Sequence, residues 1–521
     1  MIESQDDRRC FLVGRTGSGK SAALQHLENT RPERVVRISP EDLSLPYITD
    51  LQVIKYLDSL DVKLDPFWIA LWKHVLIVEI IRRRYKIDSP EEKQRFLDRL
   101  RERLTRDAGK QAALQYLDDF EGRFWVEADE RVKQITNTFT ERIGTEAGVD
   151  LGAGPAKLGG KVNGLHEEEL RSHQELAARF QRVVNDTQLA RLNKMLTILD
   201  DEILDHAHYT YVIIDDLDRD WVDERITNDL IRCLFRTVLD MQKVTNLKVL
   251  VALRSNIFQE LDFGRSGGQE EKFRSLVLEM TWTDKGLEEM LEERLKVAAR
   301  KSGVVIEGLR SLLPHTNKSR GNPLRYILDR TLKRPRDAIA FVNECLVRAA
   351  GGNSISWEDI LAAERQYSSR RLLALRDEWK PTYPHIDAIF ARFRGAPARM
   401  TRDQFTARLD DCMLLVTEPQ FTGVSWLNDA SNAMWGYNVG KKSWAELYQS
   451  LTAMLYEIGL IGMASRTSAA PVFYDEDPLL AESITSLERC EFFFLHRTFQ
   501  RALDVETADE DRGRQLNLSV P

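Results

Sequence analysis

The stretch that decides the fold reads Cys10-Phe11-Leu12-Val13-Gly14-Arg15-Thr16-Gly17-Ser18-Gly19-Lys20-Ser21-Ala22. It begins as a short apolar run, continues as the pattern G-x-x-x-x-G-K-S, and enters a helix-forming segment that extends to Leu27. This is the order strand, glycine-rich loop, helix. Glycines let the backbone turn with its N–H groups facing inward, and the N-terminus of the helix adds partial positive charge. The stretch therefore predicts a phosphate-binding loop, with a glycine-rich turn carrying an incidental lysine as the alternative.

The composition of this loop predicts its ligand. We expect nucleotide contacts from Gly14, Arg15, Thr16, Gly17, Ser18, Gly19, Lys20, Ser21 and Ala22. Lys20 would reach the β- and γ-phosphates as a catalytic residue, and Ser21 would hold Mg²⁺. The expected ligands are therefore ATP and Mg²⁺.

A second apolar run ends in acidic residues. The segment Tyr211 to Ile214 is suited to a central parallel strand, and it is followed by Asp215-Asp216-Leu217-Asp218-Arg219. A P-loop enzyme needs a carboxylate that holds Mg²⁺ from the side opposite the loop hydroxyl. Asp215 is the expected Mg²⁺ ligand, and Asp216 stands where such enzymes keep the carboxylate that orients water. For Asp218 and Arg219, nucleotide sensing and a salt bridge in the loop remain equally open.

A third apolar run, Leu247 to Leu253, precedes Arg254-Ser255-Asn256. If this strand lies between the other two, its end faces the γ-phosphate. Arg254 or Asn256 could then report whether that phosphate is present. Helix capping by Ser255 or Asn256 is the alternative.

Taken together, these residues resemble a known group of proteins. The D-D-x-D-R form of Asp215 to Arg219 is similar to that of KAP-type and related STAND-class P-loop ATPases, which are relatives of the AAA+ proteins. Leu253 to Phe258 resembles their arginine-bearing sensor segment, and Arg334 to Ile339 opens a helix as their lid segments do. The stretches from Ser356 to Ser368 and from Asp377 to Trp379 also look like bacterial members of this class.

The resemblance implies a fold and a set of roles. The implied fold is an α/β P-loop NTPase of the ASCE type, with a parallel sheet and a helical lid. The spacing and the residue patterns described below add a large helical insertion and a C-terminal winged-helix-like α+β region. Arg254 takes the sensing role among the catalytic residues, and Arg336 is the second sensor from the lid. Asp216 stands where many AAA+ proteins carry glutamate, and STAND-class relatives are often slow hydrolases that use nucleotide as a switch.

The spacing of the motifs predicts how the chain is divided. Lys20 and Asp215 lie 195 positions apart (215 minus 20), far more than a minimal nucleotide-binding fold needs. We expect an ATPase core from residues 1–50 and 206–283 and a mostly helical insertion with a glycine-rich flap from 51–205. A helical lid from 284–355 and a helical, winged-helix-like region from 356–521 follow.

The last region carries the pattern of a winged helix. A helix-like run from Trp444 to Gly459 leads into Leu460-Ile461-Gly462-Met463, and Val472-Phe473-Tyr474 looks like the returning wing. Such modules bind DNA or protein, and the sequence does not choose between them. The basic cluster of Arg392, Arg394, Arg399 and Arg402 is more often a solvated face than a DNA contact.

The composition indicates which partners and which cellular compartment to expect for the chain. The formal charge of −8 gives no global basic field, so any nucleic-acid contact must come from a local patch. The five cysteines lie far apart, as buried thiols in a reducing cytoplasm do, and no signal-peptide pattern opens the chain.

The apolar stretch Phe67 to Ile81 is interrupted by charges and predicts a buried helix, not a membrane span. His206 and His208 lack a third metal ligand at suitable spacing and predict a structural role.

These observations support three hypotheses. The first is a cytoplasmic, slowly hydrolysing ATP switch that controls a protein partner or an assembly, for which the resemblance suggests a setting in bacterial defence or signalling. The second is a DNA-associated AAA+-like motor or loader that uses the winged helix, for which DNA would stimulate hydrolysis. The third is a scaffold that binds ATP without chemistry. A homo-oligomer stays open, because a composite site would borrow an arginine from a neighbouring copy.

Overall fold

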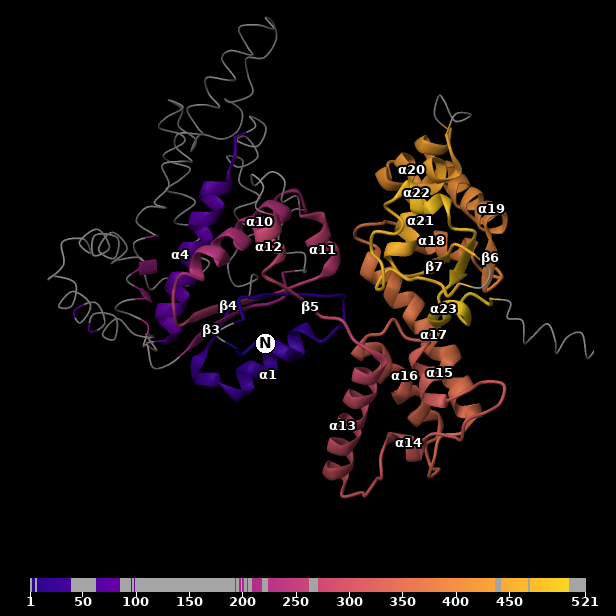
Figure 1. The fold of residues 1–521 in the computed structure, drawn as a ribbon, viewed down its shortest axis with the longest axis horizontal. Coiled ribbons are helices and arrows are strands. Elements are labelled where there is room, and N and C mark those ends of the chain that lie inside the picture. The colour runs from indigo at the N-terminus through magenta and orange to yellow at the C-terminus, as the bar shows by residue number, and fades with distance from the viewer. Residues whose placement is uncertain are drawn as a thin grey trace, which may run out of the picture. The chain divides into compact units, whose positions relative to one another are not determined.

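A computed structural model describes residues 2–4, 7–38, 62–84, 209–217, 224–261, 270–435, 442–466 and 469–505, with isolated positions between 95 and 204. The chain divides into two compact units (Figure 1). The first comprises Met1–Arg15 and Gly19–Met280, and the second comprises Thr16–Ser18 and Thr281–Pro521. Our expectations for the glycine-rich flap, His206, His208, Asp218 and Arg219 lie outside the described residues. The four-part division of the chain stays a prediction.

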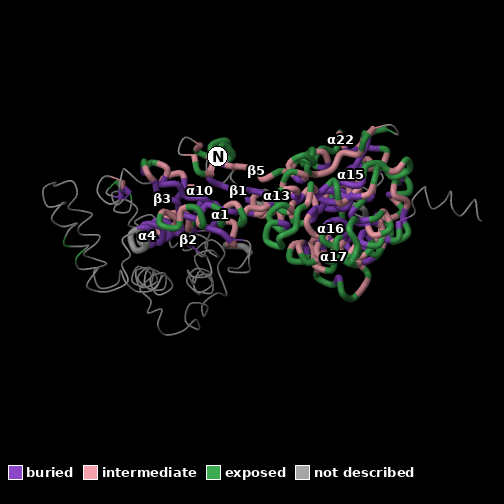
Figure 2. The backbone as a smooth tube through the Cα atoms, turned by 90° about the horizontal axis from the view of Figure 1, so that it is seen from below, coloured by how far each residue is buried: buried purple, intermediate pink, exposed green. Residues whose placement is uncertain are grey.

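The first unit is built on a five-stranded parallel sheet. Its order is β2 (Val35–Ile38), β3 (Thr210–Ile214), β4 (Leu247–Leu253), β1 (Phe11–Val13) and β5 (Val277–Glu279). The apolar runs of β1, β3 and β4 are buried along their whole length, as strands covered on both faces must be, and Figure 2 shows this for β1 and β3. One strand separates β1 from β3, as expected for the ASCE type. The first unit therefore has the α/β fold of P-loop NTPases.

Helices accompany this sheet along the chain. They are α1 (Lys20–Thr30), the short η1 (Pro32–Arg34), α4 (Asp65–Arg84), α10 (Glu224–Met241), α11 (Ser255–Glu260) and α12 (Glu270–Arg274). Phe11 of β1 stacks on Phe235 of α10 with ring centroids 3.5 Å apart. Strand β5 pairs with β1 from Val277 to Glu279, and the backbone N–H of Met280 still donates to the carbonyl of Val13 at 2.8 Å.

Helix α4 confirms the predicted buried helix. Trp68 and Trp72 are each 1% exposed, and the indole Nε1 of Trp72 donates to the carbonyl of Leu230 at 3.0 Å. Of the charged groups that interrupt this helix, buried Lys73 places its Nζ 2.6 Å from a carboxylate oxygen of Asp240. A buried lysine is tolerated because it is paired in this way. Among the described helices, none has the length and hydropathy needed to span a bilayer.

The second unit begins as a helical bundle. Its helices are α13 (Asp284–Ser302), α14 (Leu309–Leu312), α15 (Pro323–Leu328), α16 (Pro335–Arg348) and α17 (Trp357–Trp379). The rings of Phe341 and Tyr367 stack 4.5 Å apart and join α16 to α17 in a buried core. Helix α17 starts at a capping box, in which Ser356 and Asp359 exchange hydrogen bonds between side chain and backbone.

The rest of this unit surrounds a small antiparallel sheet of order β6-β8-β7. The elements are α18 (Ile386–Arg392), β6 (Arg399–Thr401), α19 (Arg402–Met413), η8 (Leu414–Thr417), η9 (Pro419–Phe421), α20 (Ser425–Trp435), α21 (Trp444–Glu457), β7 (Ile461–Ala464), α22 (Ile484–Glu488), β8 (Phe492–Leu495) and α23 (Arg497–Gln500). The prediction that the returning strand of the wing begins at Val472 is wrong. Val472 makes only an isolated bridge to Met463, and the strand that pairs with β7 over its length is β8.

Candidate functional site

The glycine-rich loop follows β1 directly and is tied to the neighbouring strand. The backbone N–H of Gly14 donates to the carbonyl of Leu253, the last residue of β4, at 3.2 Å. Gly19 precedes the first residue of α1 with φ 102°, a left-handed conformation that is strained for residues with a β-carbon. The loop therefore needs glycine at this position to turn from the strand into the helix.

Lys20 folds back over the loop. Its Nζ donates to the carbonyl of Gly14 at 2.7 Å and to that of Arg15 at 3.3 Å. These contacts hold a positive charge above the loop backbone, next to the N-terminus of α1. An anion bound there would meet the lysine, the backbone N–H groups and the positive end of the helix dipole.

Asp215 and Asp216 follow β3, at the same edge of the sheet. Asp215 is 7% exposed, and one of its carboxylate oxygens accepts the backbone N–H of Asp216 at 3.0 Å. Asp216 has φ 63°, in the left-handed region that aspartate tolerates better than most residues. Carboxylate and hydroxyl oxygens are the ligands that Mg²⁺ prefers, so Asp215 and Ser21 are chemically suited to hold the ion.

Arg37 belongs to this group of charges, and the sequence analysis missed it. It lies in the edge strand β2, and its guanidinium is 3.8 Å from Asp215 and 3.1 Å from Glu28. The only signal in the sequence is a single arginine in the apolar run Val35-Val36-Arg37-Ile38, which identifies no role by itself.

Arg254 follows β4 and precedes α11, as expected for a residue at this edge. The structure overturns the capping alternative: the N-cap residue of α11 is Arg254 itself, without a side-chain capping bond, and Ser255 is already the first helical residue. Neither Ser255 nor Asn256 therefore caps the helix. The sensing role of Arg254 stays a prediction.

The tip of the loop, Thr16–Ser18, groups with the second unit. Within that unit, the backbone N–H of Arg336 donates to the carbonyl of Gly17 at 3.3 Å, and the indole of Trp282 donates to the carbonyl of Ser18 at 2.8 Å. Gly17 has φ 83°, and a β-carbon there would lie 2.8 Å from the β-carbon of Arg336. Glycine is thus required at Gly17 for conformation and for space.

Arg334 is a second residue that sequence reasoning missed. It is 2% exposed, and its guanidinium donates to the carbonyl of Thr16 at 3.0 Å and to Glu378 at 3.1 Å. The resemblance of the lid segment pointed to Arg336 alone, since nothing local marks Arg334 as the buried arginine. The second-sensor role of Arg336 stays a prediction.

Two polar atoms of the loop support a ligand at this place. The hydroxyl oxygens of Thr16 and Ser18 are buried and have no hydrogen-bond partner among the described residues. Buried hydroxyls are normally satisfied, so these atoms fit a loop that takes up an anion between its donors. The loop's own donors therefore suit a phosphate group.

Other candidate chemistry is absent from the described residues. The five cysteines are buried, and burial raises the pKa of the Cys10 and Cys345 thiols to about 12, which removes them as nucleophiles. Among the described residues, no group of three His, Cys, Asp or Glu side chains could hold a metal ion.

The arginines of the second unit that formed a basic cluster in sequence are engaged internally. Arg392 pairs with Glu418 at 3.0 Å, and Arg394 pairs with Asp504 at 3.4 Å. Arg402 donates to the carbonyl of Cys490 at 2.7 Å, and Arg399 lies over the ring of Phe492. These contacts favour the interpretation of this cluster as part of the folded surface.

Comparisons with known proteins gave a family model for part of the chain and a remote structural neighbour. A family model described as the FunZ-associated C-terminal helical domain matches residues 285–376, which span α13 to α17 except for the last three residues of that helix. A solved Walker-type ATPase of Pyrococcus abyssi is similar over 92% of both chains, with 11% identity and a TM-score of 0.35. That score is too low for the similarity to say how this chain works. A search of curated proteins found no match.

Proposed function

We propose that this chain binds ATP with Mg²⁺ and hydrolyses it slowly, as a regulatory switch that controls a protein partner or an assembly. The observation that carries the proposal is the meeting of three strand ends at one edge of the parallel sheet. Gly14 follows β1, Asp215 follows β3 and Arg254 follows β4, and each is a residue type that phosphate or Mg²⁺ chemistry needs.

The proposed roles divide between the loop and the strand ends. The residues Gly14 to Ala22 cradle the phosphates, Lys20 neutralises them, and Ser21 and Asp215 hold the ion. When bound, Mg²⁺ supplies positive charge that stabilises the phosphoryl oxygens. Asp216 orients the attacking water, and Arg254 and Arg336 sense the γ-phosphate. Slow turnover is expected because Asp216 is one methylene shorter than the glutamate of many AAA+ proteins.

In this proposal, the lid and the C-terminal region transmit the effect of ATP binding to the partner. ATP closes the helical lid of residues 284–355 on the core and changes how the insertion and the C-terminal region meet a partner. The order α18, β6, α19, α20, α21, β7, β8 with the sheet order β6-β8-β7 supports a winged-helix module there. In such a module α21 takes the place of the recognition helix.

The surface of that helix favours protein over DNA as the partner. The sequence of α21 is WAELYQSLTAMLYE, with two glutamates and neither lysine nor arginine. DNA binding draws most of its affinity from positive charge against phosphates, and the nearby arginines are already engaged with this chain's own groups. No observation favours the motor or loader, so we retain the switch.

Binding of a fluorescent ATP analogue tests the proposal. We expect the wild type to bind it in Mg²⁺ and Lys20→Ala to bind it about 10- to 100-fold more weakly, because a charge-assisted contact to phosphate is lost. Lys285→Ala is the matched control, since this lysine of α13 has a side chain that is 85% exposed. Equal affinities for wild type and Lys20→Ala would contradict the proposed site.

A further inference from the structure

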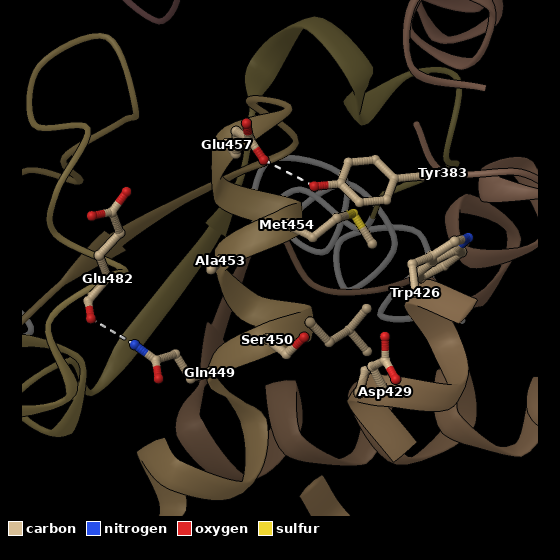
Figure 3. Close-up of a pocket in the computed structure, with 11 residues that line it drawn as sticks. Tyr383, Trp426, Asp429, Gln449, Ser450, Ala453, Met454, Glu457 and Glu482 are labelled. Carbon is tan, nitrogen blue, oxygen red and sulfur yellow. Dashed lines mark hydrogen bonds between the residues drawn. The ribbon is translucent and has the colours of Figure 1, made fainter. Parts of the chain in front are cut away.

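The second unit contains a pocket of about 490 Å³ on the α20 and α21 side of the proposed winged helix. Figure 3 shows Ser450 and Met454 of α21 facing Trp426 and Asp429 of α20, with Tyr383 above them, whereas Gln449 and Glu482 lie on the other side of α21. The volume lies within the range of pockets that bind small molecules. None of the site residues described above lines it.

One wall of the pocket is aromatic and held in place. The rings of Tyr383 and Trp426 meet edge to face with centroids 5.6 Å apart. The indole of Trp426 donates to the carbonyl of Pro384 at 3.2 Å, and the hydroxyl of Tyr383 donates to Glu457 at 3.0 Å. Because both rings are anchored by their polar ends, the wall is formed before anything binds.

The rest of the pocket carries negative charge. Asp429, Glu457 and Glu482 line it from three different segments, and the described lining residues include neither lysine nor arginine. Gln449 on α21 fixes the rim, because its amide donates to the carbonyl of Glu482 at 2.7 Å. An anchored aromatic wall beside carboxylates is the environment that attracts a cation, through the ring faces and through ion pairs.

We propose that this pocket docks a basic peptide segment of a protein partner and seats an arginine side chain between Trp426 and the carboxylates. A guanidinium suits the pocket because it stacks on aromatic faces and bonds carboxylates with a planar fork. The three carboxylates would repel DNA phosphates. This inference rests on the proposed switch and names the chemistry of the partner that the switch controls.

The test measures binding of a fluorescein-labelled nine-residue peptide, designed with three arginines in a glycine-serine background, to the full chain without nucleotide. The same peptide with citrulline in place of arginine has nearly the same shape without charge. We expect binding of the arginine peptide only. The double variant Asp429→Asn/Glu482→Gln, at two exposed positions, should weaken it about tenfold.

The matched control is Asp403→Asn/Glu491→Gln, which removes two negative charges from exposed positions outside the pocket. We expect it to change the affinity less than about twofold, since distant surface charges are screened. Equal binding of the two peptides, or equal losses in the two double variants, would overturn the proposal.

Competition experiments distinguish the basic peptide from other possible occupants of the pocket. Displacement of the peptide by spermine at equal charge concentration would assign the pocket to a small polyamine, and displacement by duplex DNA would assign this face to nucleic acid; either result overturns the proposal. Lys20→Ala should bind the peptide as the wild type does. A failure of peptide binding therefore leaves the proposed ATP site intact, and a failure of ATP binding leaves the pocket intact.

Discussion

The parallel sheet of the first unit and the antiparallel sheet of the second unit carry their candidate sites differently. In the first unit, Gly14, Asp215 and Arg254 each follow a strand, so the sheet itself sets their positions. In the second unit, the pocket lies away from the strands, on side chains of α20, α21 and two loops. A site placed by the backbone leaves a local motif in the sequence, whereas a site placed by side chains of separate segments leaves none.

The largest effect is expected at Asp216, which follows a strand of the parallel sheet and therefore tests whether the sheet positions the catalytic groups. We expect Asp216→Asn to lower ATP turnover about 100-fold or more, since a carboxylate that orients water contributes roughly that much. Affinity for the ATP analogue should stay unchanged. Asparagine accepts the left-handed backbone at φ 63° as aspartate does, so the variant changes the chemistry and keeps the geometry.

The measurement for Asp216→Asn is steady-state phosphate release beside nucleotide affinity. Asp216→Ala serves as the contrast, because it adds backbone strain to the loss of the carboxylate. Unchanged turnover in Asp216→Asn would favour the scaffold that binds ATP without chemistry.

A smaller effect, on stability, is expected at a glycine of the second unit. Gly19 serves the loop through its backbone conformation, whereas Gly462 of β7 gives room to a neighbour: a β-carbon there would lie 2.7 Å from the ring of Phe473. We expect Gly462→Ala to lower the free energy of unfolding of the second unit by about 2 kcal/mol through overpacking. Affinity for the ATP analogue should not change.

Urea denaturation measures this loss, and Gly462→Ala/Phe473→Leu provides the matched double variant. The smaller leucine should recover part of the stability if the clash with the ring is the cause. A loss that persists in full in the double variant would show that Gly462 is needed for another reason.

The same contrast explains what the sequence could predict. The loop from Gly14 to Ser21 and the strand before Asp215 were predicted because their patterns are continuous in the chain. Strand β8 was missed, since Phe492–Leu495 pairs with β7 and β6 across long stretches that include α22. The partners of Arg37 and Arg334 could not be predicted either, because ion pairs between distant residues have no local signature.

The pocket was beyond sequence analysis for the same reason. Tyr383, Trp426 and Glu482 lie in segments separated by dozens of positions, and each alone is an ordinary surface or core residue. Only folding brings an anchored aromatic wall beside carboxylates. The winged-helix interpretation of the region did predict α21 and β7, because the helical period and the apolar run are local.

ATP hydrolysis by the purified chain, with and without double-stranded DNA and beside Lys20→Ala, tests the central claim most directly. We expect slow turnover that is abolished in Lys20→Ala and unchanged by DNA. Strong stimulation by DNA would contradict the switch in favour of a motor, and turnover that survives in Lys20→Ala would contradict the site itself.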